Sequence, residues 1–293
     1  MKPVFDPLGR RYVLVAPERA KRGIPLPPPD QPDPAPCDFC EGNEGRTPRE
    51  SYAIRVHGSN PDEPGWRVRV VPNLYPATAF HEVVIHSPDH YAGFERFSHG
   101  MRRAVLLAYR ERVSACPLPC TVVIVNRGSA AGASRTHDHS QIYGLEQIPP
   151  TLARETEAFT AADDCVVCDF ASNEKLRVAT TEKATIVAHP VPTMAQELVV
   201  IPPHVASITD AETGDLGAIA DALGEAVSRL QLHLGATLPF NLVIHTAPVG
   251  VDQFHWHAHV FPRLVRWGGL EIGAEMPIVA ADPQETARRL RDS

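Results

Sequence analysis

The chain has 293 residues, of which 43% are hydrophobic, and a formal net charge of −7. This acidic balance argues against a protein that binds nucleic acid or membrane surfaces by electrostatic attraction, because such proteins carry a basic excess. No apolar run approaches the roughly 20 residues of a membrane span, and the N-terminus MKPVFDPLGRR has no apolar signal segment. We therefore predict a cytoplasmic protein that is long enough for two domains.

The first half of the chain contains a series of distinct landmarks. A proline-rich segment at residues 25–36 predicts a loop or extended arm, and it leads into the cysteine pair CDFC. An apolar run that ends at His90 predicts a strand, and an amphipathic segment over about residues 94–114 predicts a long helix. The stretch TVVIVN predicts a further strand ending at Asn126, after which the motif SRTHDHSQIYG follows.

The second half repeats these landmarks in the same order. It contains the cysteine pair CVVC, the apolar run ELVVIPPH ending at His204, an amphipathic segment over about residues 210–234, and the stretches NLVIHTAP and FHWHAHVFPR. Such a repeat indicates a duplicated unit. We predict an α+β fold of two tandem domains, residues 1–150 and 151–293, each with an antiparallel sheet and one long helix.

Each half also carries the residues of a Cys2His2 metal site. The first set is Cys37, Cys40, His90 and His137; the second is Cys165, Cys168, His204 and one histidine of HWHAH. Four such ligands favour tetrahedral zinc and leave no open coordination position, which is typical of structural sites. A thioredoxin-like redox role for the cysteine pairs would not explain the accompanying histidines. Spacing alone leaves open which of His255, His257 and His259 is the ligand.

The motif SRTHDHSQIYG places three polar side chains on one face of a strand, because side chains alternate along it. If a metal holds His137, then His139 is rigidly placed and able to react. A neutral imidazole can attack an α-phosphorus and form a phosphoramidate, which divides one transfer into two steps. The loop between Asn126 and Ser134 offers donors for phosphate oxygens, and Gln141 can stabilise the charge that develops there.

Three other polar residues are expected to matter less. Asp138 points to the opposite strand face, so that its replacement by serine should affect His139 only slightly. His86 is expected to be a surface histidine. His245, in IHTAP, receives no role, because the second cysteine pair already completes a ligand set.

In this order, the motifs resemble those of the galactose-1-phosphate uridylyltransferases and the related ADP-glucose phosphorylases, the transferase branch of the histidine-triad superfamily. The resemblance spans nearly the whole chain and rests on DPLGRRYVLVAPERAKRG, VVPNLYPA, HEVVIHSPDH, VNRGSAAGASRTHDHSQI, FHWHAHVFPRL and PQETARRLRD. It implies two histidine-triad-like domains, two structural zinc ions per chain and a homodimer. It also implies a ping-pong reaction on nucleotide sugars and sugar phosphates, with no nucleic acid or membrane partner.

The resemblance further implies a role for individual residues. His139 matches the nucleophile, and Gln141 matches a residue that contacts the transferred phosphoryl group. The implied substrate-binding residues are Arg19, Arg22, Asn73, Asn126 and Ser134. The alignment through the following F-P-R selects His255 as the zinc ligand of the second half.

Two departures from the family leave alternatives. Galactose-specific members keep a glutamine and aromatic residues near the acceptor sugar, where this chain has Ala274 and Ala281. This departure leaves the identity of the sugar open. The resemblance favours a UDP-glucose:hexose-1-phosphate uridylyltransferase, with an ADP-sugar or dinucleotide phosphorylase as the alternative. The alternating histidines HWHAH would allow a second active site at His257, but the matching phosphate loop is missing. A nonenzymatic zinc protein that senses nucleotides is a third hypothesis.

Overall fold

The computed structural model describes residues 3–15, 36–234 and 238–293 and has the predicted α+β architecture. Nearly all of the predicted proline-rich arm lies outside these residues. Within the described residues, the main sheet consists of strands paired with antiparallel neighbours. Their order is β3 (Tyr52–Arg55), β4 (Trp66–Pro72), β5 (Phe80–Ile85), β7 (His139–Leu145), β6 (Cys120–Arg127), β11 (Phe240–His245), β12 (His257–Pro262), β10 (Leu198–Ile201), β9 (Thr185–Ala188) and β8 (Arg177–Thr180).

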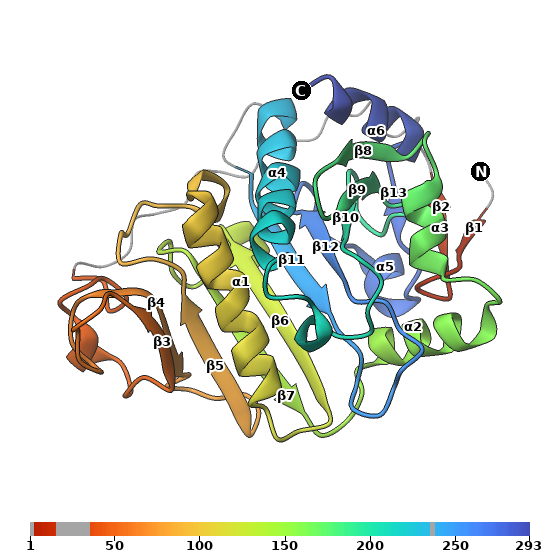
Figure 1. Ribbon diagram of the computed structural model, residues 1–293. Helices are drawn as coiled ribbons and strands as arrows, with labels where there is room; N and C mark the ends of the chain where they lie inside the picture. Colours follow the sequence, from red (N-terminus) through yellow and green to blue (C-terminus); the bar gives the residue numbers. More distant parts are fainter. Residues whose placement is uncertain (1–2, 16–35, 235–237) are drawn as a thin grey trace.

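The two predicted long helices cover one face of this sheet. Helices α1 (His99–Ser114) and α4 (Leu216–Leu234) lie side by side across it (Figure 1). Their apolar faces and the sheet enclose the main hydrophobic core. Both helices begin about five residues later than predicted, because the short 3-10 turns η3 (Phe94–Arg96) and η5 (Ile208–Asp210) come first. Ser98 caps α1 by accepting a hydrogen bond from the Met101 N–H.

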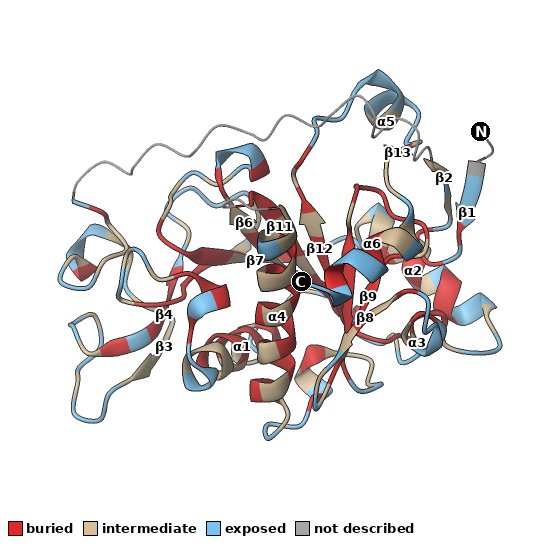
Figure 2. Ribbon diagram, turned by 90° about the horizontal axis from the view of Figure 1, so that it is seen from above, coloured by how far each residue is buried: buried red, intermediate tan, exposed pale blue. Residues whose placement is uncertain are grey.

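The opposite face of the sheet is partly covered by shorter helices. Helices α2 (Pro150–Ala161) and α3 (Val166–Ser172) pack there over a second apolar cluster under the C-terminal half. Figure 2 shows that the strands near the centre of the sheet are largely buried, whereas α5 (Gly269–Gly273) is exposed. The remaining short elements are η2 (Glu44–Arg46), η4 (Ser129–Ala131) and α6 (Pro283–Arg291). In the described part of the chain, no α-helix packs on this face of β4 and β5, in the first half of the sheet.

The repeat seen in the sequence appears as two mirrored runs of strands. The five strands β3 to β7 of the first half and the five strands β8 to β12 of the second half have the same order of pairing, counted from the two outer edges of the sheet. Strands β6 and β11 pair at the junction. The two halves therefore share one continuous sheet instead of carrying two separate ones. A domain boundary at residue 150 stays a prediction.

A small sheet joins the two ends of the chain. Strands β1 (Pro3–Asp6) and β2 (Arg11–Val15) are antiparallel, and β13 (Ile278–Val279) adds to β2 in parallel. In the described part of the chain, no helix combines the length and apolar character needed to cross a bilayer.

Glu44 ties the segment that carries Arg46 and Thr47 to strand β4. Its carboxylate accepts hydrogen bonds from Trp66 Nε1 at 2.8 Å and from the Gly42 N–H at 3.1 Å. Burial opposes ionisation, but these hydrogen bonds prevail and lower the pKa of Glu44 below its ordinary 4.5. A depressed folded-state pKa contributes stability that is complete above pH 4.5 and is lost as the pH falls further.

We therefore expect Glu44→Gln to lose less stability than the wild type when the pH is lowered below 4.5. Urea unfolding followed by tryptophan fluorescence at several pH values measures this slope. Glu146→Gln, at an exposed position, is the control and should follow the wild type. Parallel curves for Glu44→Gln and the wild type would contradict the expectation.

Candidate active site and metal centres

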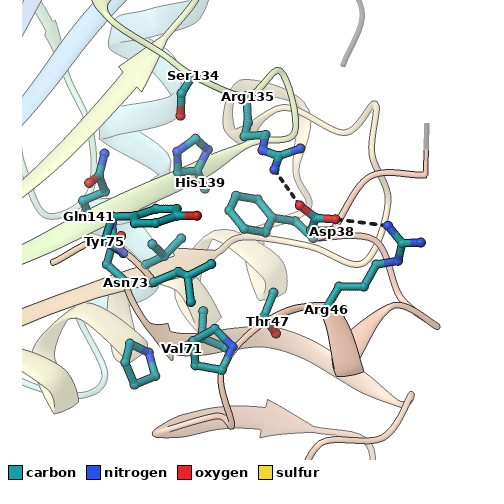
Figure 3. Close-up of a pocket in the computed structure, with 15 residues that line it drawn as sticks. Asp38, Arg46, Thr47, Val71, Asn73, Tyr75, Ser134, Arg135, His139 and Gln141 are labelled. Carbon is teal, nitrogen blue, oxygen red and sulfur yellow. Dashed lines mark hydrogen bonds and ion pairs between the residues drawn. The ribbon is translucent and has the colours of Figure 1, made fainter. Parts of the chain in front are cut away.

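A cavity of about 460 Å³ opens on the face of the first half of the sheet opposite to α1. Its wall combines β7, the connection between β4 and β5, and the segment that follows the first cysteine pair (Figure 3). Four of the predicted site residues line it: His139, Gln141, Ser134 and Asn73. The structure thus brings together residues that are up to 68 positions apart in the sequence, Asn73 and Gln141 being the most distant.

The other predicted substrate-binding residues do not join this wall. Arg19 and Arg22 lie outside the described residues. Asn126 is absent from the part of the cavity wall that the described residues form; its Oδ1 accepts a hydrogen bond from Asn241 Nδ2 at 2.7 Å. Asn241 also donates to the Ala131 carbonyl, at 2.8 Å. Asn241 therefore links Asn126, in the first half of the sheet, to the loop beside the cavity.

The cavity also has charged residues that the sequence did not single out. Asp38 accepts a hydrogen bond from Arg135 at 2.5 Å and forms an ion pair with Arg46 at 3.5 Å. Phe39 lies against the His139 ring, with 5.3 Å between ring centroids. The only signal in the sequence that Asp38 lies near the site was its position between the two cysteines of CDFC. The two arginines supply positive charge in a protein whose net charge is negative.

The ring of His139 has a defined tautomer. Its Nδ1 lies 2.9 Å from the carbonyl oxygen of His137, and a carbonyl can only accept a hydrogen bond. Nδ1 is therefore the protonated nitrogen, and in the neutral ring the lone pair is on Nε2. His139 is largely buried on the cavity wall. This is the form of imidazole that acts as a nucleophile.

Asp138 faces the helix layer, on the side of β7 opposite to His139, as predicted. Its carboxylate accepts hydrogen bonds from Arg127 Nη1 at 2.9 Å and the Phe94 N–H at 2.9 Å, and it lies 3.0 Å from His86 Nδ1. Burial opposes ionisation, but His86 and Arg127 outweigh it and hold the pKa of Asp138 at about 2. The expectation of a surface His86 was wrong, because its ring is fully buried and lies 2.9 Å from the Tyr109 hydroxyl.

Through these contacts, Asp138, immediately before β7, connects the end of β5, the end of β6 and the turn before α1. We expect Asp138→Ser to lower the free energy of unfolding by about 3 kcal/mol, because it leaves His86 and Arg127 without their buried partner. Urea unfolding at pH 7 measures this loss. Asp163→Ser, at an exposed position, is the matched control. A loss no larger than that of the control would show that the buried network contributes little.

The first predicted zinc set is assembled in the structure. The ligand atoms of Cys37, Cys40, His90 and His137 all lie within 4.8 Å of one another. Sulfur-to-nitrogen distances of 3.5 to 3.7 Å match the edge of about 3.5 Å expected for tetrahedral zinc with these ligands. His137 Nε2 donates to the Ser87 carbonyl at 2.9 Å, which turns Nδ1 toward the thiols. Burial lowers the pKa of His137 to about 4 and keeps the ring neutral.

The second set has the same construction. Cys165, Cys168, His204 and His255 bring their ligand atoms within 4.8 Å of one another. His255 Nδ1 lies 3.5 Å from both thiol sulfurs, and its Nε2 donates to the Pro202 carbonyl at 2.9 Å. The geometry therefore groups His255, and neither His257 nor His259, with the cysteines. The donor atoms of both sets fit zinc, while the number of bound ions stays a prediction.

A third group of potential ligands was not foreseen in the sequence. Glu155, His245, His257 and His259 are all buried, and their ligand atoms lie within 4.8 Å of one another. Glu155 comes from α2, and the sequence offered no signal that this helix would reach the strand of histidines. His189 and Glu197 extend the group through His259. Oxygen and imidazole donors of this kind suit a divalent metal.

The possible second active site at His257 is disfavoured by this burial. The ring is fully buried, lies beside Glu155 and stacks on Phe254. A side chain enclosed in this way cannot meet a substrate. The equivalent His139 lines an open cavity.

The chain is similar to proteins of known function. The family model described as galactose-1-phosphate uridyl transferase, N-terminal domain, matches residues 75–149. The ADP-glucose phosphorylase of Arabidopsis thaliana is 28% identical over 330 residues, covering 98% of this chain and 91% of that protein. The galactose-1-phosphate uridylyltransferase of Haemophilus influenzae is 26% identical over 297 residues, covering 89% of this chain and 84% of that protein.

A solved structure extends this similarity to the fold. The crystal structure of an ADP-glucose phosphorylase from Arabidopsis thaliana with bound ADP-glucose has a TM-score of 0.88 at 26% identity. The match covers 100% of this chain and 98% of that one. These similarities confirm the resemblance that the sequence motifs predict.

Proposed function

We propose that this chain, a nucleotidyltransferase resembling the galactose-1-phosphate uridylyltransferase family, transfers a nucleoside monophosphate in two steps through His139. In the first step, His139 Nε2 attacks the α-phosphorus of a nucleoside-diphosphate sugar. The bond from that phosphorus to the bridging oxygen breaks, and sugar 1-phosphate leaves. In the second step, a phosphate oxygen of the acceptor attacks the same phosphorus, and the bond to His139 breaks.

The observation that carries this proposal is the fixed tautomer of His139 on the cavity wall. The His137 carbonyl holds the proton on Nδ1, so that Nε2 carries the lone pair that would attack a phosphorus in the cavity. Because His137 also belongs to the first Cys2His2 set, a bound zinc would fix the strand at this point. The ring therefore has little freedom to lose when the substrate binds.

The residues around His139 suit an anionic substrate. Arg135 and Arg46 carry positive charge at the cavity, and Ser134 offers a hydroxyl group. Gln141 can donate hydrogen bonds to the phosphoryl oxygens, where negative charge develops in the transition state. Phe39 and Tyr75 add aromatic surface on which a nucleobase can stack.

Among donors, ADP-glucose with inorganic phosphate as acceptor is the first candidate. The similarity to an ADP-glucose phosphorylase extends over 98% of the chain, and the departures at Ala274 and Ala281 agree with a site that is not galactose-specific. This reverses the order favoured by the sequence. UDP-glucose with a hexose 1-phosphate stays as the second candidate, because the family model and the bacterial uridylyltransferase also match.

Intact-mass measurement of the purified protein tests the proposal. After incubation with ADP-glucose or UDP-glucose, one of the two should add a single AMP or UMP per chain. Adding phosphate or galactose 1-phosphate then identifies the acceptor that removes it. Tight binding of nucleotides without any adduct would favour the nonenzymatic sensor and overturn the proposed mechanism.

A further inference from the structure

Gln141 is held by two side chains that lie next to it on the same face of the sheet. Its Oε1 accepts a hydrogen bond from the Tyr143 hydroxyl at 2.8 Å and lies 2.8 Å from His81 Nε2. The His81 and Tyr143 rings stack on each other, with 4.0 Å between their centroids. Neither ring is part of the cavity wall formed by the described residues. Both rings contact Gln141, which lines the cavity, and His81 also lies near Asn73 on the same wall.

The hydrogen bonds of His81 decide where its proton is. The N–H of Ala77 donates to His81 Nδ1 at 3.0 Å, and a backbone N–H cannot accept. A neutral imidazole has a single acceptor nitrogen, so the proton is on Nε2, which donates to Gln141 Oε1. Asn73 Nδ2 lies 3.2 Å from the same nitrogen but is itself a donor, and its Oδ1 already accepts from the Tyr75 N–H.

These contacts fix which end of the Gln141 carboxamide faces the substrate. With the amide reversed, its NH2 group would face the N–H of His81, and two donors would oppose each other. The observed orientation directs both hydrogen-bond donors of Gln141 away from His81 and Tyr143. Gln141 lines the cavity beside His139 (Figure 3). A phosphoryl group on His139 would lie within the reach of these donors.

We propose that His81 and Tyr143 are positioning residues for nucleotidyl transfer, which lock the Gln141 amide so that its N–H groups face the transferred phosphoryl group. This inference rests on the proposed function of His139. A donor that is already oriented toward developing charge lowers the barrier without reorganising during the reaction. An unlocked amide would instead rotate between a productive and an unproductive orientation.

The neutral state of His81 is part of this arrangement. Burial lowers the pKa of His81 below its ordinary 6.5, although the contact with Gln141 opposes the shift. His81 is 7% exposed. The ring therefore keeps one donor and one acceptor nitrogen at neutral pH, as both of its contacts require.

Single-turnover formation of the nucleotidyl adduct, followed by quenched flow and intact mass, tests the inference. We expect Tyr143→Phe and His81→Leu each to slow adduct formation about 10-fold at saturating donor, with the donor concentration for half-maximal rate changed less than about two-fold. Tyr143→Phe keeps the ring that stacks on His81, so it tests the hydrogen bond in a chain that retains its packing. Tyr12→Phe and His57→Leu, at exposed positions away from the cavity, are the controls.

Two further variants distinguish a positioning role for His81 and Tyr143 from a general effect on the structure of the site. His81→Gln can still donate toward Oε1 and should recover much of the rate lost in His81→Leu. In a Gln141→Ala background, Tyr143→Phe should have no additional effect, because the side chain that it positions is gone. Wild-type rates for Tyr143→Phe, additive losses in the double variant, or no recovery with His81→Gln would each overturn the inference.

The outcome also separates this inference from the proposed function. A wild-type protein that forms no adduct with either donor overturns both. A wild-type protein that forms the adduct, with Tyr143→Phe and His81→Leu forming it equally fast, overturns the positioning role alone.

Discussion

His139→Ala is expected to abolish the nucleotidyl adduct and to lower turnover by about 1,000-fold or more. The variant lacks the imidazole ring, whose Nε2 is the proposed nucleophile and whose tautomer the His137 carbonyl sets. Direct transfer between donor and acceptor would then require both substrates in the cavity at once. Intact mass measures the adduct, and a coupled assay of sugar 1-phosphate release measures the turnover.

The controls for this variant address folding and the site of attachment. His57→Ala, at an exposed position, should form the adduct at the wild-type rate. Peptide mapping of the wild-type protein under alkaline conditions should place the nucleotide on the peptide that contains His139. An adduct that persists in His139→Ala would identify another nucleophile and contradict the role given to this residue.

Removal of a predicted metal ligand should have a large effect on zinc content and on stability. Cys40→Ser and Cys168→Ser are each expected to lower the zinc content by one ion per chain and the free energy of unfolding by about 4 kcal/mol or more. The reason is that four ligands from three distant segments meet at each site, so that a bound ion would join these segments. Elemental analysis and urea unfolding measure the two quantities.

The two sites should differ in their effect on catalysis. The first site contains His137, whose carbonyl orients His139, so Cys40→Ser should also slow adduct formation. The second site lies in the other half of the chain, and Cys168→Ser should retain the rate in the molecules that remain folded. Cys116→Ser, outside both ligand sets, is the control. A zinc-free wild-type protein of unchanged stability would refute the structural role of both sites.

Local patterns were sufficient to predict the two long helices and the candidate ligand sets, apart from the choice of histidine in the second set. Hydrophobic periodicity located α1 and α4 to within a turn or two, because an amphipathic helix needs its apolar stripe at a fixed spacing. The cysteine pairs and lone histidines predicted both Cys2His2 sets, because thiolate and imidazole are the ligands that structural zinc requires. Both helices were predicted to begin too early, since a 3-10 turn precedes each one.

Residues whose role depends on a distant partner were not predictable in this way. Asp138 and His86 looked unimportant, yet they meet in the layer between β7 and α1. Glu155 gave no signal, because its role depends on how α2 packs beneath β12. His81 likewise gains its significance only from the pairing of β5 with β7, which places it opposite Tyr143.

Two rows of alternating residues show what the sequence determined and what the tertiary structure decided. They are His137, His139 and Gln141 in the first half, and His255, His257 and His259 in the second. By itself, the sequence determined the alternating spacing of each row and grouped His137 with the first cysteine pair, whereas only the family resemblance assigned His255 to the second pair. Only the tertiary structure decided that the first row borders a cavity and the second is buried against Glu155 and Phe254. The reason is that the burial of a strand face depends on the elements that pack over it, and these come from other parts of the chain.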